Sequence, residues 1–235
     1  MSKISIIVPV WNEEGTIEAL VHRIHSSLAP KFTYEIIFID DRSTDGSIAV
    51  MQRLARDFPL VIRTKKAERG KAQSILEGMS YARYGVIAMI DADLQYPPEA
   101  IAKMARQIGT GGFDIVVGNR QENHTHLHRK VMHEACRLLL GKWLHNLDVD
   151  IQSGLKVFKR DVINVIPSTL SPWAFDLEFL VHARNAGYTI GSCDIVFDKR
   201  HSGEPKINLI EGTWQITVSA LRLKLKRFPR MAYSS

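Results

Sequence analysis

Short apolar runs rich in β-branched residues alternate along the first half of the chain with longer amphipathic stretches. The runs predict strands. The stretches carry apolar residues every three or four positions and predict helices with one buried face. The predicted strands are 4–10, 34–40, 60–64, 85–91 and 114–118, and the predicted helices are 14–28, 48–55, 71–84 and 97–107.

The predicted strands are apolar throughout rather than alternating, which is typical of strands buried on both faces. Regular alternation with helices therefore predicts an α/β fold, a mixed, mainly parallel sheet flanked by helices in a single domain. Ligands of such sheets bind outside the carboxyl ends of the strands. That rule directs attention to residues 9–14, 40–41, 91–93 and 118–120.

The second half of the chain is less regular. It predicts helices at 129–147 and 175–186, strands at 154–158 and 189–197, and loops at 121–128 and 199–206. No Pro-, Gly- or Ser-rich linker divides it, so one domain is expected to span residues 1–206. Residues 207–235 are expected to form a basic amphipathic C-terminal helix. Its apolar stripe is Ile210, Trp214, Val218, Leu221, Leu225 and Phe228. Leu223 lies off this stripe, which leaves open whether the helix packs on a partner or lies on a membrane.

Composition excludes several classes of protein. The 235 residues are 45% hydrophobic and 24% charged, as in ordinary globular proteins. Two cysteines cannot form a disulfide framework, no stretch approaches the roughly 18 apolar residues of a membrane span, and the first residues do not read as a signal peptide.

The net charge of +6 is concentrated at the C-terminal end. Residues 199–230 contain eight basic and two acidic residues, so residues 1–198 are neutral overall. A basic end favours an anionic partner: a phosphate-bearing substrate, an anionic membrane surface or a nucleic acid. The neutral body and the lack of interleaved aromatic and basic residues argue against nucleic acid.

Asp91 and Asp93 follow the most apolar predicted strand. Alternate residues of an extended chain point the same way, so the two carboxylates would repel each other unless a cation lay between them. Mg²⁺ or Mn²⁺ fits, because these ions take oxygen ligands and share them with substrate phosphates. The alternative is a turn in which Asp caps the helix that follows.

Asp40 and Asp41 end the second predicted strand. A carboxylate there could accept hydrogen bonds from a ribose or a base, as in dinucleotide-binding folds. The alternative is a turn in which Asp41 and its neighbours cap the next helix. Glu13 could contact the nucleotide, or its carboxylate could stabilise the start of the next helix through the helix dipole, and the sequence leaves both readings open.

The chain lacks a glycine-rich phosphate loop. A diphosphate would therefore rest on a metal ion and on basic side chains. The candidates are Arg69, Lys71, Arg120, Arg129 and Arg200. Alternating histidines at 124, 126 and 128 are read as an exposed substrate loop, with a zinc site as the alternative.

Taken together, these motifs resemble the family 2 glycosyltransferases with the Rossmann-like GT-A fold. Within that family the chain is most similar to the polyprenyl-phosphate sugar transferases, the dolichol-phosphate mannose synthase type. The motifs are 8–14 (VPVWNEE), 39–41 (IDD), 43–46 (STDG), 69–71 (RGK), 89–99 (MIDADLQYPPE), 153–154 (SG) and 200–203 (RHSG). Two positions depart from the family pattern, His133 and Pro205, where serine is common.

The resemblance implies a role for each matched residue. The nucleotide would be bound by Pro9, Trp11, Glu13, Asp40, Asp41, Lys71, Asp91, Ala92 and Arg200. Mg²⁺ or Mn²⁺ would be held by Asp91, Asp93 and Gln95, and the acceptor phosphate by Arg120 and Arg129. The catalytic set would thus be Asp93, Gln95, Arg120 and Arg129. Asp176 and Glu178 are candidates for contacts near the sugar.

The implied reaction is metal-dependent transfer of a sugar from GDP-mannose or a UDP-sugar to dolichyl or undecaprenyl phosphate. An ionised acceptor phosphate can attack in one step with inversion, so no general base is needed. The expected location is the cytoplasmic face of a membrane, bound peripherally. Two alternatives remain: a saccharide acceptor in cell-envelope polysaccharide synthesis, and a sugar nucleotidyltransferase, although the latter would need a glycine-rich loop where Trp11 to Glu14 stand.

Overall fold

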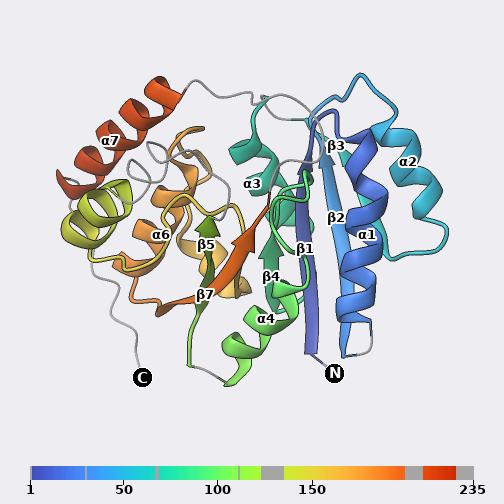
Figure 1. The fold of residues 1–235 in the computed structure, drawn as a ribbon, viewed down its shortest axis with the longest axis horizontal. Helices are drawn as coiled ribbons and strands as arrows, with labels where there is room; N and C mark the ends of the chain where they lie inside the picture. The colour runs from blue at the N-terminus through green and yellow to red at the C-terminus, as the bar shows by residue number, and fades with distance from the viewer. Residues whose placement is uncertain are drawn as a thin grey trace.

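A computed structural model describes residues 2–29, 31–66, 69–110, 112–122, 135–198 and 209–225. Its centre is a seven-stranded sheet in the order β3-β2-β1-β4-β6-β5-β7 (Figure 1). The strands are β1 (Ser2–Val10), β2 (Phe32–Asp40), β3 (Leu60–Thr64), β4 (Val86–Met89), β5 (Ile115–Glu122), β6 (Lys156–Lys159) and β7 (Ile190–Phe197). The predicted mixed, mainly parallel α/β sheet is confirmed.

Only β6 runs against its neighbours in this sheet. It pairs antiparallel with β4 and with β5, whereas β1–β2, β1–β4, β2–β3 and β5–β7 are parallel pairs. Lys156, at the start of β6, is therefore opposite Met89 at the end of β4 and opposite Val117 of β5. The residues just before β6 thus arrive at the edge of the sheet where β4 and β5 end.

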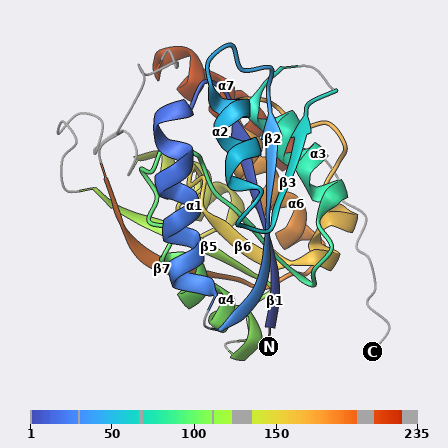
Figure 2. The same ribbon diagram turned by 90° about the vertical axis from the view of Figure 1, so that its right-hand side faces the viewer.

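Helices cover both faces of the sheet, and Figure 2 shows the sheet between them. One face carries α1 (Glu14–Leu28), α2 (Ser47–Leu54) and α4 (Ala100–Thr110), whose buried residues join one apolar cluster. The other face carries α3 (Lys71–Tyr81), α6 (Phe175–Asn185) and α7 (Leu209–Leu225). Between β5 and β6 lies a π-helix, η1 (Arg137–Leu144), and a 3₁₀-helix, η2 (Arg160–Val165), follows β6.

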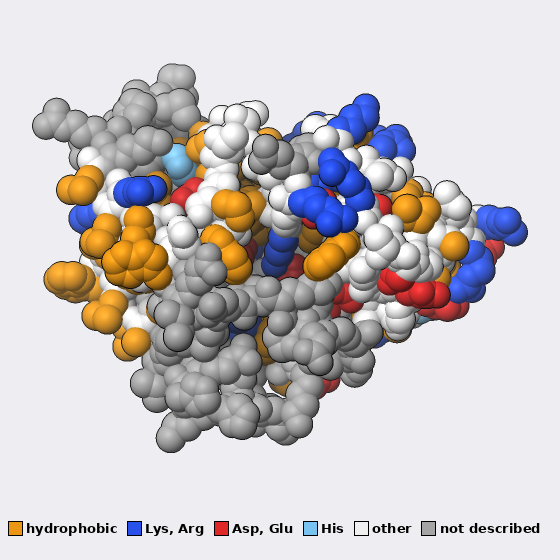
Figure 3. Space-filling model, turned by 90° about the horizontal axis from the view of Figure 1, so that it is seen from above, with side chains coloured by type: hydrophobic (Ala, Val, Ile, Leu, Met, Phe, Trp, Pro, Cys, Tyr) orange, Lys and Arg blue, Asp and Glu red, His pale blue; other side chains and the backbone are white. Residues whose placement is uncertain are grey.

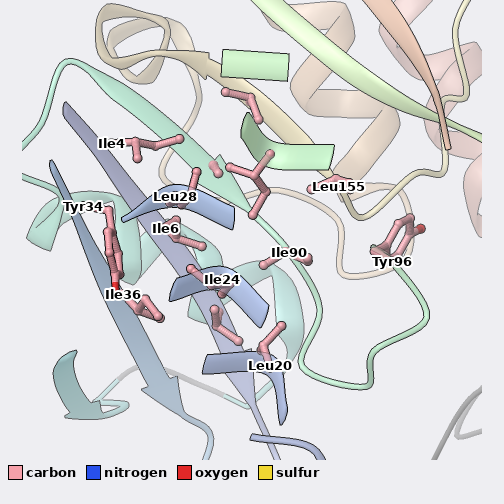
Figure 4. Packing of buried hydrophobic residues seen from close by; sticks show 14 of the residues in the cluster. Ile4, Ile6, Leu20, Ile24, Leu28, Tyr34, Ile36, Ile90, Tyr96 and Leu155 are labelled. Atoms are coloured by element: carbon pink, nitrogen blue, oxygen red, sulfur yellow. The ribbon is translucent and has the colours of Figure 1, made fainter. Parts of the chain in front are cut away.

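The two cores follow from the apolar runs in the sequence. Leu20, Ile24 and Leu28 repeat on one face of α1 and pack over Ile4 and Ile6 of β1 (Figure 4). All five side chains are fully buried. Strands buried on both faces account for the absence of polar alternation in the sequence.

Some predicted boundaries are wrong, for identifiable reasons. The helix expected over 71–84 ends at Tyr81 because the amides of Arg83 and Tyr84 donate to Ser5 Oγ rather than to the helix. The loop expected from 121 begins later, because pairing with β7 extends β5 to Glu122. The strand expected to reach Asp91 ends at Met89, so Asp91 and Asp93 stand on the loop beyond it.

The C-terminal helix α7 packs on the body of the domain through residues that the predicted stripe does not include. Ile216, Ala220 and Leu223 are buried in the core on that face. Trp214, Leu221 and Leu225, which belong to the predicted stripe, face outward and are exposed. Leu223 lies off the stripe because it belongs to the packed face. Within the described residues, no helix is both long enough and apolar enough to cross a membrane.

Candidate active site

A bidentate ion pair joins the loop after β4 to the first residue of α3. Lys71 Nζ lies 2.6 Å from Asp91 Oδ1 and 2.8 Å from Asp91 Oδ2. Partial removal from water lowers the pKa of the Lys71 ammonium, but the charges of Asp91 and Asp176 outweigh that effect. Its pKa therefore lies above its ordinary value, and Lys71 is a cation at neutral pH.

The backbone of Gly154 closes one side of this ion pair. A β-carbon built on Gly154 would stand 2.6 Å from Asp91 Oδ2 and 3.0 Å from Lys71 Nζ. The amide of Gly154 donates to the hydroxyl oxygen of Tyr96, at 2.7 Å. Burial raises the pKa of Tyr96 to about 12, so its hydroxyl stays protonated. Residues far apart in sequence thus meet around one carboxylate.

Asp93 and Gln95 continue the same loop. Asp93 is buried, and its Oδ1 accepts the amide of Gln95 at 3.2 Å. Gln95 Nε2 donates to the backbone oxygen of Asp198, just after β7, at 3.3 Å. Its amide oxygen is the atom through which Gln95 could join the shell of a cation. Ala92 is buried between the two aspartates.

These residues fit a hard divalent cation. Asp91 and Asp93 supply carboxylate oxygens, and the ammonium of Lys71 already stands where both oxygens of Asp91 converge. Within the described part of the chain, no three His, Cys, Asp or Glu side chains gather as a complete metal cage. Substrate phosphates and water would complete the shell, as is usual for Mg²⁺.

The ends of β2 and β3 meet the N-terminus of α3 beside this loop. Asp41 accepts the Gly70 amide at 2.8 Å and the Lys65 ammonium at 3.1 Å. Lys65 Nζ also donates to the carbonyl of Gly70 at 2.9 Å, and its side chain is fully buried. Asp41 therefore ties the β2 end to the turn that precedes Lys71.

Asp40 has a different environment from Asp41. It is fully buried, and its carboxylate accepts the amides of Arg42 and Ser43 at 3.1–3.3 Å. Asp40 thus shapes the turn after β2. Asp45 accepts the amide of Ser47, the first residue of α2, at 3.0 Å.

The end of β1 contributes one exposed ring and one buried carboxylate. Pro9 is half-buried within β1, and the Trp11 ring is 40% exposed with the guanidinium of Arg69 5.8 Å from its centre. Glu13 is buried, and its amide donates to Ser47 Oγ at 2.9 Å. Trp11 and Arg69 together therefore offer a flat cationic and aromatic surface beside the strand ends.

Left-handed backbone conformations gather at this edge of the sheet. Asn12 (φ 54°), Arg42 (φ 61°) and Leu94 (φ 62°) follow the ends of β1, β2 and β4. Such conformations cost side-chain-bearing residues about 1 kcal/mol and are common around ligand sites. They turn the three loops sharply, so that the aspartates stay close to the strand ends.

Arg120 lies on β5 and pairs with Asp150. Its Nε and Nη2 are 2.5 Å and 3.1 Å from the two oxygens of Asp150, whose side chain is fully buried. The guanidinium also lies 5.3 Å from the centre of the Phe197 ring, which meets the Tyr96 ring edge-on at 4.9 Å. Arg120 is thus held rigidly on the side of the site opposite the nucleotide candidates.

The sequence reasoning missed Lys156. Its side chain is fully buried, and its ammonium donates to the carbonyl of Ser153 and to Asp176 Oδ1. Burial lowers the pKa of Lys156, and the charge of Asp176 opposes that effect. A lysine inside an apolar strand was the signal that could have found it. Glu178, the other sugar candidate, instead accepts the amide of Ser171 at 3.0 Å.

The structure brings most predicted site residues to one edge of the sheet, on the loops after β1, β2 and β4 and on β5. Arg129, Arg200 and the histidines at 124, 126 and 128 lie outside the described residues, as do His133 and Pro205. Their predicted roles stay predictions.

Two curated relatives are similar over most of the chain. Dolichol-phosphate mannosyltransferase of Pyrococcus furiosus is 27% identical over 213 residues, which cover 87% of this chain and 59% of that protein. Its counterpart in Saccharomyces cerevisiae is 27% identical over 219 residues, covering 87% and 80%. The chain thus spans between about three-fifths and four-fifths of these relatives.

Solved structures share the fold. Glucosyl-3-phosphoglycerate synthase from Mycobacterium tuberculosis, in complex with Mn²⁺, UDP and phosphoglyceric acid, superposes with a TM-score of 0.73 at 18% identity and covers 97% of this chain and 80% of its own. A mannosyltransferase from Pyrobaculum calidifontis, in complex with GDP-Man and Mn²⁺, gives 0.70 at 18% identity, covering 97% and 65%.

The glycosyl transferase family 2 model matches residues 5–166, which include every described loop of the site except the one after β7. A match to a glycosyltransferase family argues against the nucleotidyltransferase alternative. The chain belongs to glycosyl transferase family 2.

Proposed function

We propose that this glycosyltransferase moves a sugar from a nucleoside-diphosphate sugar to a polyprenyl phosphate, with Mg²⁺ or Mn²⁺ at Asp91 and Asp93. Relatives named for dolichol phosphate, and a fold neighbour in complex with GDP-Man and Mn²⁺, support the choice of substrates. GDP-mannose or a UDP-sugar is the donor.

The observation that carries the proposal is the bidentate pair of Lys71 with Asp91 beside the buried Asp93. The carboxylate of Asp91 already pairs with one cation, the ammonium of Lys71, which supports a cation site here. A bound divalent ion would neutralise charge on the departing diphosphate and so lower the barrier. Lys71 then offers its ammonium to the same diphosphate, and Gln95 contributes its amide oxygen.

The nucleoside occupies the ends of β1 and β2. Pro9, Trp11 and Glu13 line one side of it, Asp41 accepts its hydroxyl or base hydrogens, and Ala92 packs beside it. We assign Asp40 to shaping the loop, because its oxygens already accept two backbone amides inside the protein. Arg200 is assigned to the donor diphosphate as implied by the family.

The acceptor approaches from the side of β5. Its phosphate is ionised at neutral pH and attacks the anomeric carbon without a general base, with inversion. Arg120 and Arg129 offset the repulsion between the two anionic substrates and align the attack. Asp150 keeps the guanidinium of Arg120 in place.

We further propose that residues 1–206 form the catalytic domain and that 207–235 hold it on the cytoplasmic face of an anionic membrane. Among the side chains that the structure describes, six exposed apolar residues lie on the outward side of α7 and on the adjacent η1; they are here called the outer apolar surface. They are Leu138, Leu139, Trp143, Trp214, Leu221 and Leu225. Arg222, Lys224 and Lys142 stand beside them.

Two hydrogen bonds join α7 to the end of η1, the two helices that carry the outer apolar surface. His145 Nε2 donates to the carbonyl of Ala220 at 2.9 Å, and Lys224 Nζ donates to the carbonyl of Leu144 at 3.0 Å. Viewed from above, hydrophobic side chains gather on the left, the side where α7 lies in Figure 1 (Figure 3). Tryptophan and leucine flanked by lysine and arginine are typical of surfaces that enter the membrane interface.

The test is a transfer assay with radiolabelled GDP-mannose and a panel of UDP-sugars, polyprenyl phosphate, and Mn²⁺, Mg²⁺ or chelator. We expect label from one donor to enter the organic phase with the lipid, only with metal, and in the inverted configuration by NMR. The D91N/D93N double variant should lose transfer and metal-dependent nucleotide binding.

The assay also separates the alternative acceptor. Label that enters a water-soluble or polymeric saccharide while polyprenyl phosphate stays unlabelled would support the envelope-polysaccharide reading instead. Transfer that proceeds unchanged with chelator, or in D91N/D93N, would refute the assignment of Asp91 and Asp93.

A further inference from the structure

The fully buried Lys156 has no role in the proposed chemistry, yet it lies directly beneath the site. Its ammonium donates to the carbonyl of Ser153 and, at 2.5 Å, to Asp176 Oδ1. Burying a lysine completely is costly unless its charge is paired and its hydrogen bonds are made. A hydrophobic residue would fill this strand position at lower cost, so the charge calls for an explanation.

The segment just before Lys156, residues 150–154, touches both sides of the proposed site. At one end Asp150 holds Arg120 on the acceptor side. At the other end Gly154 packs against Asp91 and Lys71 and donates to Tyr96, on the donor side. We call residues 150–154 the bridging loop.

Internal hydrogen bonds make the bridging loop one compact turn. The amide of Ser153 donates to the carbonyl of Asp150 at 3.2 Å, and the amide of Gln152 donates to Asp150 Oδ1 at 3.0 Å. The amide of Asp150 in turn donates to Asn119 Oδ1 on β5. Displacing one end of this turn would therefore displace the other.

Lys156 is the contact that anchors the bridging loop from below. Its ammonium donates to the carbonyl of Ser153, next to Gly154 in the bridging loop, and to the carboxylate of Asp176 in the first turn of α6. The charge of Asp176 also acts on Lys71. One buried ammonium thus joins the first turn of α6 to the bridging loop.

We propose that Lys156 is a positioning residue that locks the bridging loop, and so sets the placement of Asp91 for the donor and of Arg120 for the acceptor together. This rests on the proposed function, because donor and acceptor are the ligands assigned there. Lys156 itself contacts neither substrate. Removing it should weaken both sites at once, whereas removing a ligand contact on one side should weaken that side alone.

The experiment compares Lys156→Met, the double variant K156M/D176N and the control Lys159→Met. Lys159 lies on the same strand and pairs with Asp114 at 2.7 Å, far from the bridging loop. Calorimetry with GDP or UDP plus Mn²⁺ measures the donor site, and the KM for a polyprenyl phosphate measures the acceptor site. Thermal unfolding is measured for each variant.

In K156M we expect the nucleotide dissociation constant and the acceptor KM each to rise about tenfold, as for other supporting residues. K156M/D176N buries no uncompensated charge, so its melting temperature should recover while both binding constants stay raised. K159M should bind as the wild type does.

The proposal is overturned if K156M or the double variant binds both ligands normally, if only one site weakens, or if both variants fail to fold. Normal binding, or failure of both variants to fold, would make Lys156 a purely structural residue, and weakening of one site alone would show that it does not set both sites. If the wild type itself binds neither nucleotide with Mn²⁺, the proposed function fails instead, and the two failures are therefore distinguishable.

Discussion

Gly154 leaves no room for a β-carbon beside the carboxylate of Asp91 in its present position. A β-carbon at position 154 would stand 2.6 Å from Asp91 Oδ2, well inside van der Waals contact. The atom in the way is the end of a side chain, so it can move without unfolding the protein. The requirement for glycine here therefore concerns where the carboxylate points.

Gly154→Ala should leave the fold intact but push the Asp91 carboxylate aside. We expect nucleotide binding in the presence of Mn²⁺ to weaken about tenfold, because small misplacements at a reacting site are costly. Gly109→Ala is the matched control, since a β-carbon there meets nothing within 4 Å. It should bind normally and melt slightly higher. Equal binding by both variants would contradict the prediction.

Lys71→Met removes the ammonium that occupies both oxygens of Asp91. Because a divalent ion has to displace that ammonium, we expect Mn²⁺ alone to bind several-fold more tightly to the variant. Binding of GDP or UDP with Mn²⁺ should weaken, since a cation that faces the diphosphate is lost. Calorimetry measures both, with Lys142→Met as a control outside the site. If Mn²⁺ alone binds more weakly to Lys71→Met than to the wild type, the prediction is wrong.

Asp150→Asn leaves Arg120 without its buried counter-charge. Breaking a buried pair from one side costs about 3 kcal/mol, so the free energy of unfolding in urea should fall by about that amount. Asp148→Asn is the control, because Asp148 is 60% exposed and its pairs with Arg137 and Lys142 should contribute less than about 1 kcal/mol. Similar losses in the two variants would show that burial of the Arg120 pair is unimportant.

His145 makes the stability of the α7 contact depend on pH. Burial lowers the pKa of His145 below its usual 6.5, while the hydrogen bond to the carbonyl of Ala220 opposes that effect. The unfolded chain therefore binds a proton at His145 before the folded chain does. The contribution of His145 to the free energy of unfolding is complete above pH 6.5. It declines as the pH falls from 6.5 towards the lower pKa that His145 has in the folded protein.

The measurement compares melting temperatures at about pH 7.5 and about pH 5.5, a range that brackets the ordinary histidine pKa. We expect His145→Gln, which keeps an N–H donor, to lose less stability on acidification than the wild type. His22→Gln, at an exposed position on α1, should change nothing. An identical pH response in wild type and His145→Gln would sink this prediction.

The double variant Trp143→Ser and Leu225→Ser removes two of the most exposed members of the outer apolar surface. Flotation with phosphatidylglycerol vesicles should show binding by the wild type that weakens with salt, and at least about tenfold weaker binding by the variant. Val196→Ser is the control, since Val196 is also apolar and exposed but lies on β7. Wild-type protein that ignores these vesicles at low salt would exclude the membrane role.

The sequence predicted the parts of the fold that repeat a simple pattern. Apolar runs placed the parallel strands, and the strand-end rule placed Asp41, Asp91 and Asp93 at one edge, where the structure has them. These predictions succeed because a strand of a parallel sheet is buried on both faces and is therefore apolar at nearly every position, which can be recognised in the sequence.

The sequence did not predict contacts between distant segments. The apolar run around Lys156 indicated a strand but not its direction, so the meeting of Gly154 with Asp91 could not be foreseen. The partner of Arg120 was equally hidden, because Asp150 is thirty residues away on a polar stretch. On α7 the apolar stripe left open whether the helix packs or lies on a membrane, and the structure shows a helix that is apolar on two sides.

Because β6 runs antiparallel to β5, the segment between them, residues 123–155, can be exchanged for the corresponding segment of a relative. β5 ends at Glu122, and the antiparallel β6 begins at Lys156, opposite Val117, so the two strand ends that bound residues 123–155 lie at the same edge of the sheet. A segment with neighbouring ends can be replaced by a homologous one while the order of the strands stays as it is. Because this segment contains the bridging loop, we expect that grafting it from a relative would change the placement of both Asp91 and Arg120.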